Sequence, residues 1–151
     1  MLWFPTGGGK TEAYLGLTAF TLGIRRLQGD LGDVDASAGV AVLMRYTLRT
    51  LTLQQFQRAA ALICACELIR QRDVKTWGNE LFRIGLWVGS ASTPNRTSES
   101  AQAMRSAHGF AGSGKGTPHQ LETCPWCGSK IDPKKGHIQV EEYPGRARTF
   151  I

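Results

Sequence analysis

Phe4-Pro5-Thr6-Gly7-Gly8-Gly9-Lys10-Thr11 is a glycine-rich turn that ends in a lysine and a threonine. Its glycines let successive backbone N–H groups approach a nucleotide's phosphates with no side chain in the way. Lys10 would reach the β- and γ-phosphate oxygens, and the Thr11 hydroxyl would hold Mg²⁺. The stretch predicts a phosphate-binding loop for ATP and Mg²⁺, formed by Pro5, Thr6, Gly7, Gly8, Gly9, Lys10, Thr11 and Glu12. The alternative is a glycine-rich turn that happens to precede a lysine.

The residues after the loop have the spacing of a helix. Apolar side chains recur every three or four residues, at Ala13, Leu17, Phe20, Ile24 and Leu27. A glycine at position 29 is a common helix terminator. The positive end of this helix dipole would then lie under the bound phosphates.

Further along, strand-like and helical patterns alternate. Val40–Met44 is a continuous apolar run, as in a parallel strand that is buried on both faces. A second helix is predicted over Leu51–Gln71, followed by another apolar run at Phe82–Val88. We therefore expect an α/β fold with a partial parallel sheet and flanking helices. A short helix is predicted near Glu99–Ser106, inside a polar, glycine-rich segment.

Composition narrows the class of protein. The chain has 151 residues, 42% of them hydrophobic, which suffices for a buried core. Its formal net charge of +6 favours a polyanionic partner such as DNA. No apolar run is long enough for a signal peptide or a membrane span, so no membrane partner is predicted. Four cysteines without secretory features indicate a reducing, cytoplasmic location.

Two expected parts of a nucleotide hydrolase are not found in the sequence. Only Met1–Trp3 precede the loop, whereas a strand of about five residues normally runs into it. No apolar strand ends in Asp-Glu, the motif that positions Mg²⁺ and the attacking water. Glu141-Glu142 follows only a weak strand and is read as a solvated edge. We expect the chain to be a piece of a longer protein, inactive by itself, with the acidic motif and a second cysteine pair further downstream.

Cys124-Pro125-Trp126-Cys127-Gly128 has the spacing of a zinc knuckle. Two thiolates two residues apart can share one tetrahedral metal, so the pair predicts half of a zinc site. The alternative is a loop with two free thiols. Cys64 and Cys66 lie inside a predicted helix and are read as core residues. Gly112–Thr117 resembles a second phosphate loop but lacks a preceding strand and is rejected.

Arg45, Arg49, Gln54 and Gln55 follow the predicted strand at Val40–Met44. The carboxyl ends of parallel strands are where such sheets bind ligands. Arginine and amide side chains there could hold a nucleic-acid backbone without reading its sequence. A solvated helix start explains the same residues equally well.

Taken together, these segments resemble the helicase subunit of the DISARM anti-phage defence system, within superfamily 2. The likeness rests on residues 2–14, 45–49, 53–58 and 82–89, and continues at 93–97 and 124–127. Superfamily 2 helicases often read Ala-Pro-Thr-Gly-x-Gly-Lys-Thr where this chain has Phe4–Thr11. The resemblance implies that the expected partial sheet is a P-loop (RecA-like) parallel sheet. It also implies two RecA-like domains that close on ATP and step along DNA, with a zinc-binding insertion in the first.

The resemblance also implies roles for individual residues. Lys10 and Thr11 would contact nucleotide and Mg²⁺, and Cys124 and Cys127 would be half of the zinc site. The DNA-contacting motif would comprise Arg45, Tyr46, Thr47, Arg49 and Gln55. Residues 1–90 would be the start of the first RecA-like domain, 91–118 a flexible insertion and 119–151 a partial zinc ribbon. Partners would be DNA, the rest of the helicase chain and companion defence subunits.

Other functions compete with this interpretation. CRISPR-associated helicase-nucleases also carry Gly-Lys-Thr-Glu-Ala, but lack the surroundings of Arg45–Arg49 and Cys124–Cys127. A phosphate-loop kinase or metabolic hydrolase would need a catalytic carboxylate that the sequence does not offer. A non-catalytic module could bind nucleic acid through its basic surface and zinc knuckle. Salt-sensitive DNA binding that persists after Lys10→Ala would distinguish that module.

Overall fold

A computed structural model describes residues 9–46, 49–105, 116–143 and 146–150. These residues form two compact units, Met1–Ile84 and Gly85–Ile151. The first is built from helices and extended segments, and the second contains a short helix and a two-stranded sheet. The division predicted from the sequence, with boundaries after residues 90 and 118, stays a prediction.

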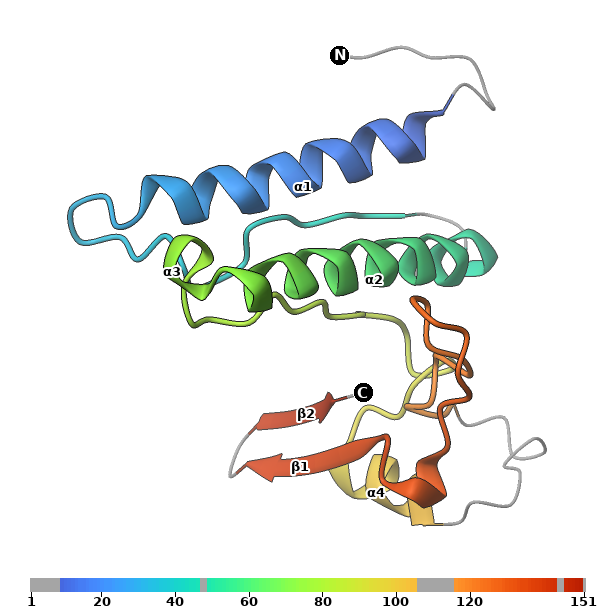
Figure 1. The fold of residues 1–151 in the computed structure, drawn as a ribbon. Helices are drawn as coiled ribbons and strands as arrows, with labels where there is room; N and C mark the ends of the chain where they lie inside the picture. The colour runs from blue at the N-terminus through green and yellow to red at the C-terminus, as the bar shows by residue number, and fades with distance from the viewer. Residues whose placement is uncertain (1–8, 47–48, 106–115, 144–145, 151) are drawn as a thin grey trace. The chain divides into compact units, whose positions relative to one another are not determined.

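The helical unit consists of α1 (Lys10–Gln28), α2 (Arg49–Arg72) and the single-turn α3 (Val74–Trp77). Helix α1 packs along α2, and α3 contacts both (Figure 1). Ala60 of α2 and Thr18 of α1 are among the buried residues, and the Thr18 hydroxyl donates to the Tyr14 carbonyl. Both long helices predicted from apolar spacing are confirmed, and α1 ends one residue before Gly29 as expected.

A polar network fixes the end of α2 to the chain that follows. Arg70 donates to both carboxylate oxygens of Glu67 and to the Gly78 carbonyl, and the Phe82 N–H donates to Glu67. Arg70 is buried, with only 7% of its surface exposed. A buried charge is stable only when it is paired and hydrogen-bonded, and this network satisfies both conditions. It therefore holds the segment after α3 against α2.

The predicted parallel sheet does not form among the described residues. Val40–Met44 and Phe82–Val88 have no strand assigned, and Val40 and Leu43 are 81% and 89% exposed. A strand is stable only when neighbouring strands satisfy its backbone N–H and C=O groups. Here the guanidinium of Arg25 binds the carbonyls of Ala38 and Val40 instead. The expected strands are thus extended segments, and the described part of this unit is helical.

The second unit contains α4 (Thr97–Arg105), the 3₁₀ turn η1 (Pro133–Lys135) and strands β1 (Gln139–Tyr143) and β2 (Arg146–Phe150). The strands are antiparallel, with Gln139 opposite Phe150, and α4 packs against both (Figure 1). The core of this unit includes Leu121 and Ile138. The short helix predicted near Glu99–Ser106 and the weak strand before Glu141 are both confirmed.

None of the helices built from the described residues has the length and apolar character that crossing a bilayer requires.

Candidate nucleotide-phosphate site

The start of α1 follows the last glycine of the predicted phosphate loop, and that glycine has a left-handed backbone. Gly9 is left-handed, with φ 73° and ψ 18°, and Lys10 is the first helical residue. The Ala13 N–H donates to the Gly9 carbonyl over 3.1 Å, which closes the first turn. Side chains other than glycine are strained at this φ, so the sequence places glycine where the backbone needs it. Pro5, Thr6, Gly7 and Gly8 lie outside the described residues.

Helix α1 begins without a side-chain cap at Gly9. The first N–H groups of a helix lack intrahelical acceptors, and they carry the positive end of the helix dipole. Lys10 and Thr11 are half-buried at this end of α1. Lys10 and Thr11 thus lie in the first turn of α1, and their contacts with phosphate and Mg²⁺ stay predictions.

Glu12 connects this end of α1 to α2. Its carboxylate forms an ion pair and a hydrogen bond with Arg58, which lies 46 positions further along the chain. The hydrogen bond from Arg58, together with the backbone N–H of Glu12 itself, lowers the pKa of the Glu12 carboxyl. Both side chains are largely exposed, so the pair orients the two helices more than it stabilises them.

The residues predicted to contact DNA are only partly described. Arg45 is exposed, and the Tyr46 hydroxyl lies 3.6 Å from the Met44 sulfur. Gln55 is half-buried, and its Oε1 is buried with no hydrogen-bond partner among the described residues. Thr47 lies outside the described residues, as does the Arg49 side chain. Their proposed role in binding DNA stays a prediction.

The predicted zinc knuckle forms a tight turn in the second unit. Thr123 and Lys130 pair as an isolated antiparallel bridge, and the Cys124 N–H donates to the Ser129 carbonyl over 2.8 Å. The Gly128 N–H donates to the Cys124 carbonyl, and Gly128 has a φ of 73°. These bonds fold the two cysteines onto one turn.

One thiol of this turn, that of Cys127, lies in surroundings that favour its thiolate form. The Cys127 sulfur lies 3.2 Å from the Ser129 hydroxyl. Hydrogen bonds from the Ser129 hydroxyl and backbone, followed by the Cys124 thiol, lower the pKa of Cys127. No group of three or more His, Cys, Asp or Glu side chains with metal-binding geometry occurs in the part of the chain that the structure describes. The described residues therefore fit two of the four ligands of a structural zinc.

Two features were not anticipated from the sequence. One is the network around Glu67 and Arg70. Their spacing of three residues indicates an ion pair on a helix, but it does not indicate that the Phe82 N–H also binds Glu67. The other is a cationic cleft where the end of α1 meets α3. Its residues come from three separate segments, so no local pattern in the sequence could have indicated it.

Comparison with known proteins adds one match. The chain is 50% identical over 97 residues to the DISARM protein DrmA of Bacillus paralicheniformis. The resemblance to a DrmA-type DISARM protein is confirmed. The matched part is 64% of this chain but 9% of that DrmA, so the chain spans a small share of its relative's length. No protein-family model and no solved structure matches the chain.

Proposed function

We propose that this chain carries the nucleotide-binding segment of an ATP-dependent DNA helicase or translocase that acts in phage defence. The observation that carries the proposal is the left-handed Gly9 directly before a helix that begins Lys10-Thr11, in a chain half-identical to DrmA over 97 residues. A RecA-like parallel sheet around this segment is part of the proposal.

The start of α1 would hold the triphosphate of ATP together with Mg²⁺. ATP supplies the phosphoanhydride bond that is cleaved. Lys10 would neutralise the β- and γ-phosphate oxygens with its ammonium. Thr11 would offer its hydroxyl oxygen as a ligand for the cation. Gly9 lets the backbone turn into the helix without a side chain in the phosphate's path. Glu12 would hold this end of α1 in register with α2 through Arg58.

DNA is the proposed substrate along which the helicase or translocase moves. The net charge of +6 and the exposed Arg45 support contacts with phosphates that are independent of base sequence. Tyr46, Thr47, Arg49 and Gln55 are proposed to complete this contact surface. Companion subunits of the defence system are proposed partners, as is the remainder of a DrmA-length polypeptide.

Zinc is proposed as a structural ion at Cys124 and Cys127. The hydrogen-bonded turn and the lowered pKa of Cys127 support thiolate ligation. Bound zinc would cross-link its ligands and stiffen the turn. Two further ligands are needed to complete a tetrahedral site.

The test is binding of a fluorescent ATP analogue to this chain in the presence of Mg²⁺, compared with Lys10→Ala. Loss of one charged hydrogen-bonding group should weaken binding roughly 10- to 100-fold. Lys130→Ala is the matched control, because it removes an exposed lysine in the second unit and should leave affinity unchanged. Equal affinities of the parent chain and Lys10→Ala would overturn the proposal.

A basic nucleic-acid-binding module without nucleotide chemistry is the second candidate, favoured by the net charge of +6. It predicts that single-stranded DNA binds equally well to the parent chain and to Lys10→Ala, with and without ATP. For the motor segment, ATP should change the affinity for DNA, and Lys10→Ala should abolish that change. Affinities measured at several salt concentrations give the number of phosphate contacts in either case, and the response to ATP separates the two candidates.

A further inference from the structure

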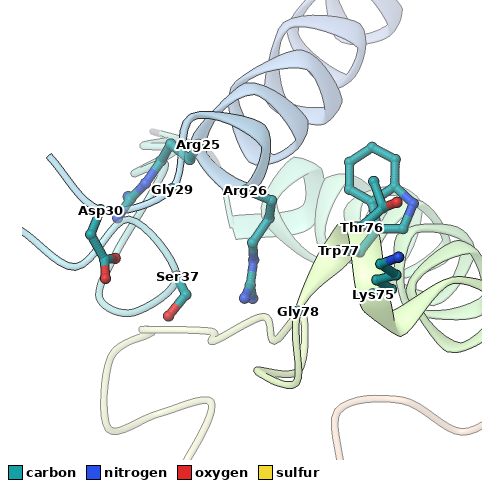
Figure 2. Close-up of a pocket in the computed structure, with 9 residues that line it drawn as sticks. All are labelled: Arg25, Arg26, Gly29, Asp30, Ser37, Lys75, Thr76, Trp77 and Gly78. Carbon is teal, nitrogen blue, oxygen red and sulfur yellow. The ribbon is translucent and has the colours of Figure 1, made fainter.

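A cationic cleft lies in the helical unit at the end of α1 that is remote from Lys10 (Figure 2). The cleft has a volume of about 230 Å³. Arg25 and Arg26 line it from α1, Asp30 and Ser37 from the following loop, and Lys75 and Trp77 from α3. Three cationic side chains thus face one carboxylate in a half-open space.

Arg26 is held firmly in this cleft by its own contacts. Its Nη2 donates to the Glu80 carbonyl over 2.9 Å, and its guanidinium stacks 4.8 Å from the centre of the Phe82 ring. Figure 2 shows the side chain extending between the loop that carries Ser37 and the turn at Gly78. The guanidinium is therefore positioned before any ligand binds.

One nitrogen of Arg26 is left without an acceptor. Its Nη1 is buried and has no hydrogen-bond partner among the residues that the structure describes. Buried charged N–H groups are costly to leave unpaired, and native structures nearly always provide them with an acceptor. The Arg26 guanidinium therefore carries a charge that its hydrogen bonds with the described residues only partly satisfy.

The other charges of the cleft are arranged differently. Arg25 donates from one terminal nitrogen to the Val40 carbonyl and from the other to the Ala38 carbonyl, which holds its positive charge at the cleft. Asp30 accepts from the Ala36 N–H through its Oδ1, and nearby Asp35 accepts from Ser37. Lys75 is exposed at the rim. Both carboxylates keep their negative charges, so the three cations exceed Asp30 and nearby Asp35 by one positive charge.

We propose that this cleft binds a phosphate group, with the fixed guanidinium of Arg26 as its main cation and Lys75 as a second cation at the rim. A phosphate suits the site because guanidinium groups pair well with its oxygens and its charge balances more than one cation. The source is either the free phosphate ion or a phosphodiester of nucleic acid.

This phosphate site is separate from the start of α1. Lys10 and Arg26 lie sixteen residues apart on one helix, which corresponds to about 24 Å at the usual helical rise. One nucleotide bound at Lys10 would not reach the cleft with the same phosphates. The two sites can therefore be tested independently.

The experiment is a titration of the chain carrying Lys10→Ala with inorganic phosphate, followed by NMR through the indole signal of Trp77. The Lys10→Ala substitution removes the lysine of the proposed nucleotide site. The Trp77 signal reports on the cleft because Trp77 lines it. We expect Arg26→Lys to weaken phosphate binding roughly tenfold, because it keeps a charge but loses the fixed guanidinium. Lys75→Ala should weaken it roughly threefold. Lys134→Ala, an exposed lysine in the second unit, should have no effect.

The outcomes either support or overturn the phosphate site. If Arg26→Lys does not fold, Lys75→Ala decides, since that side chain is exposed at the rim. Equal binding in Lys75→Ala and Lys134→Ala would overturn the proposal, and so would an equal response to acetate. With a short oligothymidylate as second probe, a Trp77 response to both probes identifies a phosphodiester as a source, and a response to phosphate alone identifies the free ion. No response at Trp77 to either probe would overturn the proposal.

Discussion

The helical unit and the cysteine turn are held together over very different distances in sequence. In the helical unit, Glu67 binds the Phe82 N–H fifteen residues away, and Glu12 pairs with Arg58 across 46 residues. The cysteine turn is closed by backbone bonds between residues no more than nine apart, such as Cys124 to Ser129 and Glu122 to Ile131. A short motif can therefore build its own site in the second case, whereas the first depends on tertiary packing.

The largest expected effect comes from Glu67→Gln, which tests whether distant contacts hold the helical unit together. The substitution leaves buried Arg70 without its charged partner and weakens the link to Phe82. We expect the unfolding midpoint of the helical unit to fall by roughly 5–10 °C. Thermal unfolding followed by circular dichroism measures it. Glu122→Gln, an exposed glutamate beside the cysteine turn, is the control. An equal midpoint in both variants would mean that the network does not hold this unit together.

Acid provides a second test of the same network. Hydrogen bonds from Arg70, opposed by burial and helped by the Phe82 N–H, lower the pKa of Glu67 from 4.5 to about 2. The folded pKa lies below the unfolded one, so the stabilisation is full above pH 4.5 and is lost as the pH falls toward 2. Urea unfolding at pH 7 and near pH 3 should show the difference between the parent chain and Glu67→Gln shrinking. A difference that stays constant over this range would contradict the assignment.

A third test concerns the local turn, where the expected loss is confined to zinc binding and the turn itself. Gly128→Ala places a side chain at a φ of 73°, which costs about 1–2 kcal/mol. Zinc affinity, measured by competition with a chromophoric chelator, should fall roughly tenfold if the turn presents the thiolates. Gly136→Ala is a matched control, with a φ of 74° outside the cysteine turn. Equal losses in both variants would show that general strain, not the turn, sets the affinity.

Much of the helical structure was predictable from local patterns. Apolar residues at helical spacing predicted α1 and α2, and Gly29 predicted where α1 ends. The strand predictions for Val40–Met44 and Phe82–Val88 were wrong for the described residues, because an apolar run shows that a segment avoids water but not what pairs with its backbone. Arg25 donates to the carbonyls of Ala38 and Val40, and the local sequence does not predict that contact.

The candidate sites divide in the same way. Gly9, Lys10, Cys124 and Cys127 were singled out from short motifs, because a left-handed turn favours glycine and two thiols two residues apart are a common metal-ligand spacing. The cleft around Arg26 was missed, since α1, the loop after it and α3 each supply only part of it. Whether ATP, Mg²⁺, DNA or zinc binds stays a prediction.

The sequence by itself determined the helices, the left-handed glycines and the turn that joins the two cysteines, because each depends on contacts a few residues apart. The tertiary structure alone decided which distant groups meet: Glu12 with Arg58, the Glu67 carboxylate with the Phe82 N–H, and Arg26 with Lys75 in the lining of one cleft. Hydrogen bonds act over about 3 Å, so groups far apart in the chain interact only after packing has brought their segments together.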